Sequence, residues 1–496
     1  MPPGDARRRA EFLALWHARD AAANGRFVAG VTSTGIYCLP ACPARRPKDE
    51  HVRFFADGSG AEAAGFRACL RCRPELFRAG VDPEVELASA LALTVRARVG
   101  DFPSVRALRA EAGVGGSKLR ELFRRQFHTT PRDFLHAERT AASAAALLAG
   151  RRPLDAALDH GFESSSVFHA AFAARLRMTP GAYAKLGASN EFELSLPPNA
   201  SVADAFAVLR RDGDVGGRTE RVEGARAWKA VLLGGRPAVL ELEVRERRVR
   251  VRVRGLARPG RARLAAAHAL VVRLLGLALD PAPFERWVAR TPGLAALVRG
   301  RTGLCIPLTA DAFEGLVWAI VGQQVNIAFA ATCRARLIEL AGTEIGDLRA
   351  HPTPDAVASL ELGDLVARQF SRRKAEYTLD SARAVASGAL DLAALARGPV
   401  GRSQPALLAL RGFGPWSANY VLMRAFGLAD CVPAGDVALA EGLMRFFELS
   451  ERPDARATVR WMERFAPHRS LATFHLWRWR STSPACAVRA REPDVA

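Results

Sequence analysis

The sequence lacks any long hydrophobic run. No part of its 496 residues forms a continuous apolar stretch of the ~18 residues that a membrane-spanning helix needs. The opening residues MPPGDARRRAEFLALW are basic but have no apolar stretch behind them, so they do not have the form of a signal peptide. We therefore expect a cytoplasmic protein with no membrane partner. In that compartment thiols stay reduced, and clustered cysteines indicate metal binding or reactivity rather than disulfides.

Acidic residues are in short supply. The chain has 71 Lys and Arg against 51 Asp and Glu, a formal net charge of +20. A GC-rich genome, which favours arginine codons, would produce part of this excess. A polyanionic partner explains so large an imbalance better, because cations that displace counterions from phosphates gain affinity. The composition, 49% hydrophobic and 25% charged, is that of a globular protein, and at ~150 residues per domain the length suggests roughly three domains.

Cysteine is also sparse, and half of the eight cysteines are clustered near the N-terminus. The others, Cys305, Cys333, Cys431 and Cys486, are scattered among apolar residues and are expected to be core cysteines. The close pairs Cys38/Cys42 and Cys69/Cys72 have the spacing of a tetrahedral four-cysteine zinc site. Zinc would also stabilise a module that is small for its own core. Spacing alone favours a structural zinc ion over a reactive one and leaves both open.

Hydrophobic periodicity predicts a multidomain protein. We expect a small α+β zinc domain at residues 1–80 and an all-α domain at 84–187, followed by alternation from about residue 188 and helical periodicity from about residue 260 to the end. The family resemblance given below divides this last part into an α+β domain at 190–300 and an all-α domain at 301–486. In AVLELEVRERRVRVRVRG, strict alternation on both sides of a short polar turn predicts a β-hairpin. Leu240, Leu242 and Val251 belong to its buried face, and Arg250 and Arg252 to the exposed one.

The helical middle part contains two candidate helix-turn-helix motifs. In the first, a turn at Gly113 precedes a helix with three arginines. In the second, a turn at Gly161 precedes a helix capped by the serines at 164–166. A plain helical bundle is the alternative. Gly115-Gly116 stands where the first motif would normally have a Ser-Pro or similar helix start.

The C-terminal part has the densest functional pattern. PALLALRGFGPWSANY predicts two helices joined by a tight hairpin at Gly412 and Gly414, where the backbone can approach a phosphate closely. CVPAGDVAL follows and contains Asp436, a candidate catalytic carboxylate and equally a candidate helix N-cap. For the aromatic residues Trp461 and Trp479 near the end of this part we expect ordinary core packing.

The N-terminal part resembles the Ada family. The resemblance covers about residues 10–78 and is carried by FVAGVTSTGIYCLPACPARRP, HVRFF and AEAAGFRACLRCRPE. It implies a Zn²⁺ site of Cys38, Cys42, Cys69 and Cys72 in which Cys38 accepts a methyl group from methylphosphotriesters in DNA. It also implies DNA contacts from Thr34, Arg45 and Arg67. Four thiolates around zinc have a net charge of roughly −2, so the sulfurs stay unprotonated and nucleophilic.

The remaining parts resemble two further families. The paired motifs at 84–187 resemble the helix-turn-helix domain of AraC-type regulators, as found in Ada, with GFESSSVF as the closest segment. Residues 190–480 resemble AlkA, the DNA-3-methyladenine glycosylase II, through DAFEGLVWAIVGQQVNIAFAA, SRRKAEYTLDSA and HRSLATFHLWRW. This resemblance makes 190–300 an AlkA-type N-terminal domain and 301–486 a helix-hairpin-helix glycosylase domain. Gln324 stands where AlkA presents an apolar wedge to the DNA stack.

These resemblances imply hydrolysis of N-glycosyl bonds. An alkylated purine such as 3-methyladenine or 7-methylguanine is cationic, so its bond to the sugar is already weak once the nucleotide is flipped out. Asp436 would stabilise the oxocarbenium-like sugar. By the same resemblance, Trp416, Tyr420 and Trp477 match aromatic positions of the AlkA base pocket and would favour a cationic base, with ordinary core packing as the alternative. Relatives that also cut the strand have a Lys where this chain has Trp416, which argues for a monofunctional glycosylase without a redox cofactor. The iron–sulfur loop of some relatives is missing.

We therefore predict a fusion of an Ada-like sensor with an AlkA-like glycosylase, associated with the nucleoid and acting in base excision repair on double-stranded DNA. Promoter DNA is a further expected partner. The chain has no Pro-Cys-His-Arg motif, so the guanine O6-methyltransferase half of Ada is not expected. The alternative is a methylation-responsive transcription regulator with a non-catalytic glycosylase-like half; the intact Asp436, Trp416 and Trp477 argue against it.

Overall fold

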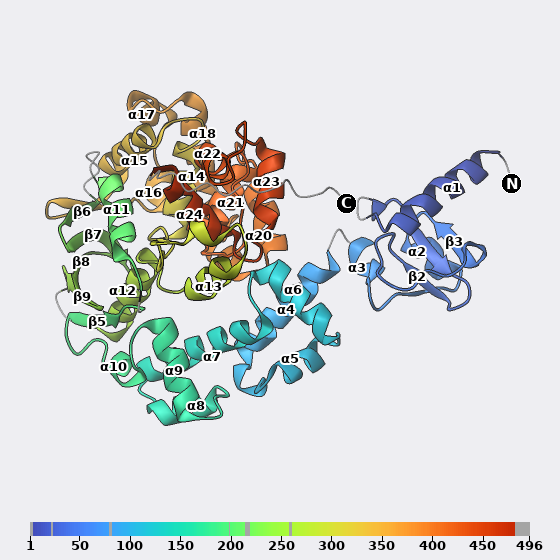
Figure 1. The fold of residues 1–496 in the computed structure, drawn as a ribbon, viewed down its shortest axis with the longest axis horizontal. Helices are drawn as coiled ribbons and strands as arrows, with labels where there is room; N and C mark the ends of the chain where they lie inside the picture. The colour runs from blue at the N-terminus through green and yellow to red at the C-terminus, as the bar shows by residue number, and fades with distance from the viewer. Residues whose placement is uncertain are drawn as a thin grey trace. The chain divides into compact units, whose positions relative to one another are not determined.

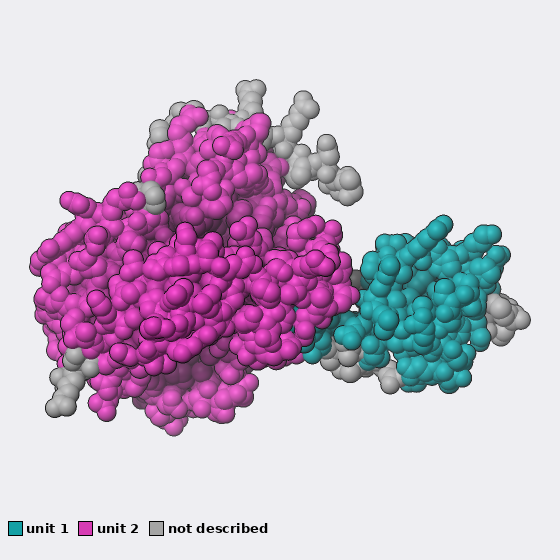
Figure 2. Space-filling view, turned by 90° about the horizontal axis from the view of Figure 1, so that it is seen from below, with its two compact units in different colours: residues 1–92 teal, residues 93–496 magenta. Residues whose placement is uncertain are grey.

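The computed structural model describes residues 3–20, 23–78, 82–197, 199–213, 219–256 and 260–481 (Figure 1). The chain forms two compact units, residues 1–92 and 93–496, which Figure 2 distinguishes by colour. In the described ranges no helix has both the length and the apolar character needed to cross a bilayer. Cys305, Cys333 and Cys431 are buried and free, which confirms the core prediction, whereas Cys486 lies outside the described residues.

The first unit has the predicted α+β character. Its sheet has the order β3-β1-β2-β4, with β1 (Val28–Val31), β2 (Ile36–Cys38), β3 (Val52–Phe55) and β4 (Arg67–Ala68). Helices α1 (Pro3–Ala18), α2 (Gly58–Ala63) and α3 (Pro74–Arg78) accompany it. The stacked rings of Phe12 and Phe27, 4.2 Å apart, and fully buried Trp16 pack α1 into this unit. Strand β2 ends at Cys38, so the sheet fixes the position of the first cysteine.

The helical segment contains the two expected helix-turn-helix pairs. Its helices are α4 (Pro83–Ala97), α5 (Val105–Ala112), α6 (Gly116–Phe127), α7 (Pro131–Leu148), α8 (Pro153–Asp159), α9 (Ser165–Leu176) and α10 (Pro180–Ala184). Gly113 ends α5 at φ 64°, and Gly161 separates α8 from α9 at φ 81°. Ser164 caps α9 by accepting the Val167 N–H. Helix α6 begins without a side-chain cap because Gly115 occupies its N-cap.

A five-stranded antiparallel sheet of order β5-β9-β8-β7-β6 follows. Its strands are β5 (Glu191–Ser195), β6 (Glu220–Glu223), β7 (Arg226–Leu233), β8 (Arg236–Arg245) and β9 (Arg248–Arg254), with helices α11 (Val202–Gly213) and α12 (Arg261–Leu274). The predicted hairpin is β8–β9: Leu240, Leu242 and Val251 are fully buried. Arg250 and Arg252 lie on the other face and pair with Glu191 of β5.

The hydrophobic core of this sheet is continuous with that of the helix-turn-helix segment. Phe168 and Phe172 of α9 belong to the same buried cluster as Phe192 and Leu240 of the sheet. His268 of α12 lies at the junction, where its Nε2 is 2.7 Å from the Leu176 carbonyl oxygen and its ring contacts those of Tyr183 and Phe192. Separating the two segments would therefore expose apolar surface.

The C-terminal part is helical, as expected. Its helices are α13 (Ala282–Arg290), α14 (Ala312–Val321), α15 (Ile327–Ala341), α16 (Pro354–Ala358), α17 (Leu362–Ala367), α18 (Arg372–Ala386), α19 (Leu392–Arg397), α20 (Val400–Leu408), α21 (Pro415–Arg424), α22 (Val437–Phe446), α23 (Ala455–Glu463) and α24 (Arg469–Ser481). Helical periodicity did not predict the short hairpin of β10 (Thr343–Ile345) and β11 (Leu348–Ala350). It forms because Leu348 and Ala350 pack on Trp228 of β7.

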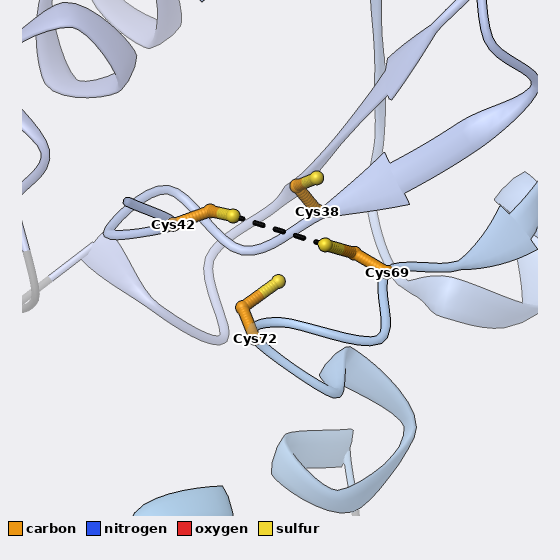
Figure 3. A group of neighbouring side chains, drawn as sticks. All are labelled: Cys38, Cys42, Cys69 and Cys72. Atoms are coloured by element: carbon orange, nitrogen blue, oxygen red, sulfur yellow. Dashed lines mark hydrogen bonds between the residues drawn. The ribbon is translucent and has the colours of Figure 1, made fainter. Parts of the chain in front are cut away.

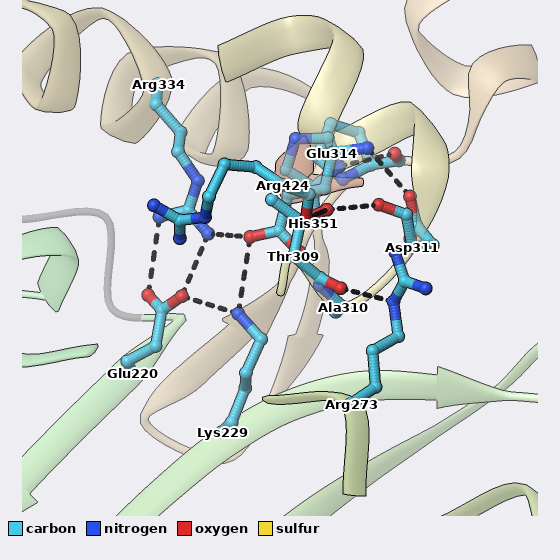
Figure 4. Close-up of polar contacts among 11 residues, drawn as sticks. Glu220, Lys229, Arg273, Thr309, Ala310, Asp311, Glu314, Arg334, His351 and Arg424 are labelled. Carbon is cyan, nitrogen blue, oxygen red and sulfur yellow. Dashed lines mark hydrogen bonds and ion pairs between the residues drawn. The ribbon is translucent and has the colours of Figure 1, made fainter. Parts of the chain in front are cut away.

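A buried group of four charges joins the five-stranded sheet to the C-terminal helices (Figure 4). Lys229 Nζ lies 2.5 Å from Glu220 and 3.4 Å from Glu314, and Arg334 contacts the same two carboxylates at 2.9 and 2.5 Å. Burial alone would raise the pKa of Glu314, but the facing Lys229 and Arg334 charges lower it. Removing one partner would leave an uncompensated buried charge, so these contacts hold the sheet and helices together.

The His268 junction makes folding of the second unit sensitive to acid. Burial lowers the pKa of His268 to about 4, from an ordinary 6.5, so the folded state requires the neutral ring. Its contribution is present above pH 6.5 and is lost as the pH falls toward 4. We expect His268→Gln, which keeps a donor for the Leu176 carbonyl, to remove on the order of 3 kcal/mol of this acid destabilisation.

Chemical denaturation at a series of pH values between 6.5 and 4.5 measures this effect. His169→Gln, at an exposed position of α9, is the control and should keep the wild-type pH profile. Identical slopes for His268→Gln and wild type would contradict the prediction.

Candidate metal centre and candidate active site

Four cysteines converge in the first unit. Cys38 ends β2, Cys42 lies in the turn that follows, and Cys69 and Cys72 come directly after β4 (Figure 3). Their Sγ atoms all lie within 4.8 Å of one another, and those of Cys42 and Cys69 are 3.9 Å apart. Tetrahedral zinc with Zn–S bonds of about 2.3 Å needs sulfurs about 3.8 Å apart. The donor set and its spacing therefore fit Zn²⁺.

The surroundings of the cluster favour a bound cation. Hydrogen bonding with Cys42 and Cys69, and then burial, raise the pKa of the Cys38 thiol, so without a cation this sulfur holds its proton. A divalent cation replaces such protons and stabilises the thiolates. The Leu39 N–H donates to Cys72 Sγ at 3.3 Å. Beside the cluster, the guanidinium of Arg46 stacks on Trp16, 3.5 Å from the ring centroid.

The expected DNA contacts of the first unit lie on its surface. Thr34, Arg45 and Arg67 are all exposed, whereas Cys38 is only 4% exposed. Thr34 is in the turn between β1 and β2, and Arg67 of β4 pairs with Ile36 of β2. The sheet thus brings Thr34 and Arg67 to the same end of β2. Arg45 lies in the loop after Cys42.

Asp436 lies at the centre of the second candidate site. It is the N-cap of α22, and its Oδ1 accepts the Leu439 N–H at 2.7 Å. The same oxygen accepts the indole N–H of Trp477 at 2.9 Å, and Oδ2 accepts that of Trp416 at 3.0 Å. The capping role and the expected position beside aromatic side chains are therefore both present. The half-buried carboxylate is held by three donors from three helices.

The predicted aromatic residues form a half-buried group around Asp436. Trp416 and Tyr420, one turn apart on α21, stack with centroids 5.4 Å apart at 27°. Trp477 of α24 packs against Phe474, 4.9 Å away. The Arg424 guanidinium lies over the rings of both Tyr420 and Phe474, at 5.9 and 5.4 Å. Aromatic rings beside a carboxylate can bind a flat cationic group.

The remaining tryptophans of this region pack elsewhere. Trp461 is 3% exposed and packs on Phe447, with ring centroids 4.7 Å apart. Trp479 packs edge-on against Phe446 at 5.0 Å. Both contact the core of the C-terminal helices, which confirms the core packing expected for them.

The hairpin between α20 and α21 depends on Gly412 more than on Gly414. Gly412 has φ +84°, and a Cβ there would lie 2.2 Å from the Tyr377 ring. Gly414 is extended backbone at the N-cap of α21, with open space around the position of a Cβ. Only Gly412 is therefore required by the local backbone. Among the described residues, no side chain caps the N-terminus of α21.

Sequence reasoning selected Gln324 and missed its neighbour Gln323. Gln324 is exposed and has φ +54°, which is uncommon for a residue with a side chain. Gln323 Nε2 donates to the Gly412 carbonyl oxygen and to Ser417 Oγ, both at 3.0 Å. It therefore joins the segment after α14 to the hairpin. The adjacent amides in VGQQVN were the only local signal, and they do not identify which side chain turns inward.

The loop before Asp436 is anchored by residues that the sequence did not suggest. The carboxylate of Asp430 accepts two hydrogen bonds from the Arg469 guanidinium, at 2.6 and 2.7 Å. The Cys431 N–H donates to Ser470 Oγ at 3.0 Å. Arg469 and Ser470 begin α24, the helix that bears Trp477. One helix thus fixes both the start of the loop and a wall of the aromatic group.

Comparisons with known proteins agree with this arrangement. Residues 11–75 match the metal binding domain of Ada, 108–186 a helix-turn-helix domain, and 317–468 the HhH-GPD superfamily of base excision DNA repair proteins. The chain is 30% identical over 480 residues to the probable bifunctional transcriptional activator/DNA repair enzyme AlkA of Mycobacterium tuberculosis, covering 92% of this chain and 94% of that protein. The chain belongs to the Ada–AlkA fusion family. It is a DNA-binding glycosylase with an Ada-type zinc domain and a helix-turn-helix domain.

Two further relatives match the glycosylase part of this Ada–AlkA protein. DNA-3-methyladenine glycosylase 2 of Escherichia coli is 32% identical over 187 residues, 37% of this chain and 63% of that protein. The solved structure of 3-methyladenine DNA-glycosylase from Archaeoglobus fulgidus has a TM-score of 0.52 at 21% identity, covering 58% of this chain and 98% of that one. This second likeness supports the fold. The four-cysteine cluster is the zinc site of the Ada-type domain.

The zinc site can be tested by metal analysis of the purified Ada–AlkA chain. We expect wild type to keep zinc through dialysis against a moderate chelator, because four thiolates bind it with a free energy of roughly 10–16 kcal/mol. The double variant Cys69→Ala, Cys72→Ala should lose it and should lose the cooperative unfolding of the first unit. Cys333→Ala, a buried cysteine of α15, is the matched control and should keep its zinc. Retention of zinc by the double variant would contradict the assignment.

Proposed function

We propose that the chain excises alkylated bases of the 3-methyladenine and 7-methylguanine class from duplex DNA, as a monofunctional glycosylase of base excision repair. The observation that supports this most directly is the carboxylate of Asp436 between the indoles of Trp416 and Trp477. The names of the curated relatives, which include DNA-3-methyladenine glycosylases, support the same substrate class. The proposed domains are 1–80, 84–187, 190–300 and 301–486.

In the proposed mechanism, Asp436 is the catalytic carboxylate. The alkylated nucleotide flips out of the duplex, and its cationic base stacks against Trp416, Tyr420 and Trp477. The C1′–N bond breaks, the base leaves neutral with the electron pair, and positive charge develops on the sugar. The carboxylate stabilises that charge and accepts a proton from the water that attacks C1′. The two indole donors hold its oxygens in place while the sugar approaches.

Other residues would hold the DNA. We assign the phosphate contact to the backbone around Gly412 and Gly414, where the N-terminus of α21 offers free N–H groups. By the family resemblance, backbone carbonyl groups around Gly412 would hold a cation, which would supply positive charge to the bound phosphate. Gln324, exposed beside the hairpin, would fill the gap that the flipped nucleotide leaves. Trp416 in place of a lysine leaves no amine to form a Schiff base, so the product is an abasic site.

In the Ada-type domain we propose a methyl transfer to Cys38. The Cys38 thiolate attacks the methyl carbon of a methylphosphotriester, so that an S–C bond forms and the C–O bond breaks. The phosphodiester leaves with the electron pair, and the protein keeps S-methylcysteine irreversibly. Thr34, Arg45 and Arg67 would bind the DNA backbone. Loss of one thiolate charge would reduce repulsion from DNA phosphates, and the helix-turn-helix domain would then bind promoter DNA.

The assignment of Asp436 is tested with Asp436→Asn. We expect base release from methylated duplex DNA to fall by roughly 10²–10³-fold, because the charge that stabilises the sugar is lost. DNA affinity should change little and the cap of α22 should be kept, since Asn caps helices as well as Asp does. Stability should fall modestly, because the amide has one acceptor oxygen and leaves the indole N–H of Trp416 without its acceptor. The matched control is Asp454→Asn, because Asp454 is the N-cap of α23 and accepts the Ala457 N–H in the same way. Wild-type release by Asp436→Asn would refute the assignment.

Methyl transfer is tested by mass spectrometry after incubation with DNA that contains methylphosphotriesters. We expect one added methyl group per chain, mapped to the peptide with Cys38, because the resemblance assigns the acceptor role to that sulfur. Cys38→Ala should take up no methyl group at Cys42, Cys69 or Cys72. A cluster without any methyl group would leave zinc with a structural role only, and a methyl group on another cysteine of the cluster would overturn the assignment of the acceptor role to Cys38.

A further inference from the structure

A histidine of the first helix-turn-helix motif lies against the catalytic loop. His128 follows α6 as its C-cap, in the left-handed conformation at φ 51°. Its Nδ1 accepts the backbone N–H of Asp430 at 3.1 Å and lies 3.9 Å from Cys431 Sγ. Asp430 begins the loop 430–436 that ends at the proposed catalytic carboxylate. The two residues that share this hydrogen bond are 302 positions apart in the sequence.

Neighbouring contacts show that the histidine is part of a built interface. The buried side chain of Gln126, on the last turn of α6, accepts the Gly401 N–H at 3.0 Å. Gly401 lies in the first turn of α20, the helix that leads to the hairpin at Gly412. The Arg96 guanidinium donates to the Arg397 carbonyl oxygen at 3.0 Å. The first helix-turn-helix motif thus contacts the glycosylase part at α20 as well as at the catalytic loop.

The bond to His128 completes the anchoring of the loop. Arg469 holds the Asp430 carboxylate and Ser470 accepts the Cys431 N–H, both from α24. The Asp430 N–H bonds to His128. Without this acceptor a largely buried N–H would lose its partner, which costs more than an exposed one because water cannot replace the bond. The hydrogen bonds described at Asp430 and Cys431, at the start of the loop, would then come from α24 alone.

The charge state of His128 suits this role. Burial lowers the pKa of His128 to about 4, against the raising effect of the nearby Asp430 carboxylate. The ring is therefore neutral near pH 7. A neutral imidazole with its proton on Nε2 presents a free acceptor at Nδ1. A protonated ring would have no acceptor to offer the Asp430 N–H.

We propose that His128 is a positioning residue of the glycosylase, through which the helix-turn-helix domain holds loop 430–436 so that Asp436 meets the flipped nucleotide. The inference rests on the proposed function of Asp436. The helix-turn-helix domain then has a part in base excision in addition to binding DNA. The alternative role for His128 is domain packing alone, which would affect stability and not the chemical step.

The test compares two substitutions in the full-length chain whose new side chains, asparagine and leucine, have the same number of heavy atoms. In His128→Asn the Oδ1 atom is an acceptor bonded to Cγ, the same position that Nδ1 has in histidine. Asparagine also tolerates a positive φ. His128→Leu introduces a side chain with the same branching and number of heavy atoms as asparagine but with no hydrogen-bond acceptor. Single-turnover base release at saturating enzyme measures the chemical step apart from DNA affinity. We expect His128→Leu to release base about tenfold more slowly, a change of about 1.4 kcal/mol in activation free energy, with DNA affinity unchanged and most of the rate restored in His128→Asn.

Hydrogen exchange provides a readout of the loop itself. The Asp430 amide should exchange faster in His128→Leu than in wild type and should regain protection in His128→Asn. His128→Gly, which tolerates a positive φ and also lacks the acceptor, should behave as His128→Leu does. It replaces His128→Leu in the comparison if leucine prevents folding.

The outcomes separate this inference from the proposed function. Full activity in His128→Leu or His128→Gly, with Asp436→Asn inactive, overturns the role of His128 and leaves the proposed function standing. Slow release in all three His128 variants, including His128→Asn, also overturns the hydrogen-bond role. Full activity in Asp436→Asn overturns the proposed function itself.

Discussion

The site depends on one constraint: a half-buried carboxylate needs hydrogen-bond donors that stay in place. Asp436 obtains two of its three from the indoles of Trp416 and Trp477, which come from α21 and α24. The same rings form the walls beside which a planar cation can stack. The group that would stabilise the sugar and the surfaces that would bind the base are thus oriented by the same hydrogen bonds. A shift of the carboxylate would therefore break its hydrogen bonds to Trp416 and Trp477.

That arrangement requires three helices to converge within about a hydrogen-bond length, and several long-range contacts hold them there. Gln323 fixes the hairpin before α21 through the Gly412 carbonyl oxygen. Asp430 and Arg469 fix the loop before α22 to the first turn of α24. Farther away, the buried group of Glu220, Lys229, Glu314 and Arg334 joins the five-stranded sheet to α14 and α15. In the buried charge group, removal of one partner would leave an opposite charge buried without compensation.

What could be predicted from the sequence was whatever depends on near neighbours in the chain. The alternation around Leu240 and Val251 predicted the β8–β9 hairpin, and the residues Pro-Ala-Gly before Asp436 predicted its cap. Asp436 and the three rings were selected because the segments that contain them resemble AlkA, and this resemblance included Trp477 although it lies 41 residues from its partner Asp436. Gln323, Arg469 and His128 were missed because their partners are 89, 39 and 302 residues away. The β10–β11 hairpin was missed for a similar reason, since its pattern is short and it packs on Trp228 of a distant strand.

The second unit joins its helix-turn-helix and glycosylase parts more closely than a flexible linker would. The buried cluster that contains Phe168 also contains Phe192 and Leu240, and His268 packs at that junction. A common hydrophobic core keeps the two parts in a fixed relative position, because separating them would expose apolar surface and break buried hydrogen bonds. On this basis α6 can present His128 to loop 430–436 in a fixed geometry. The fusion therefore does more than keep two DNA-binding activities on one chain. It also supplies His128, which bonds to the start of loop 430–436.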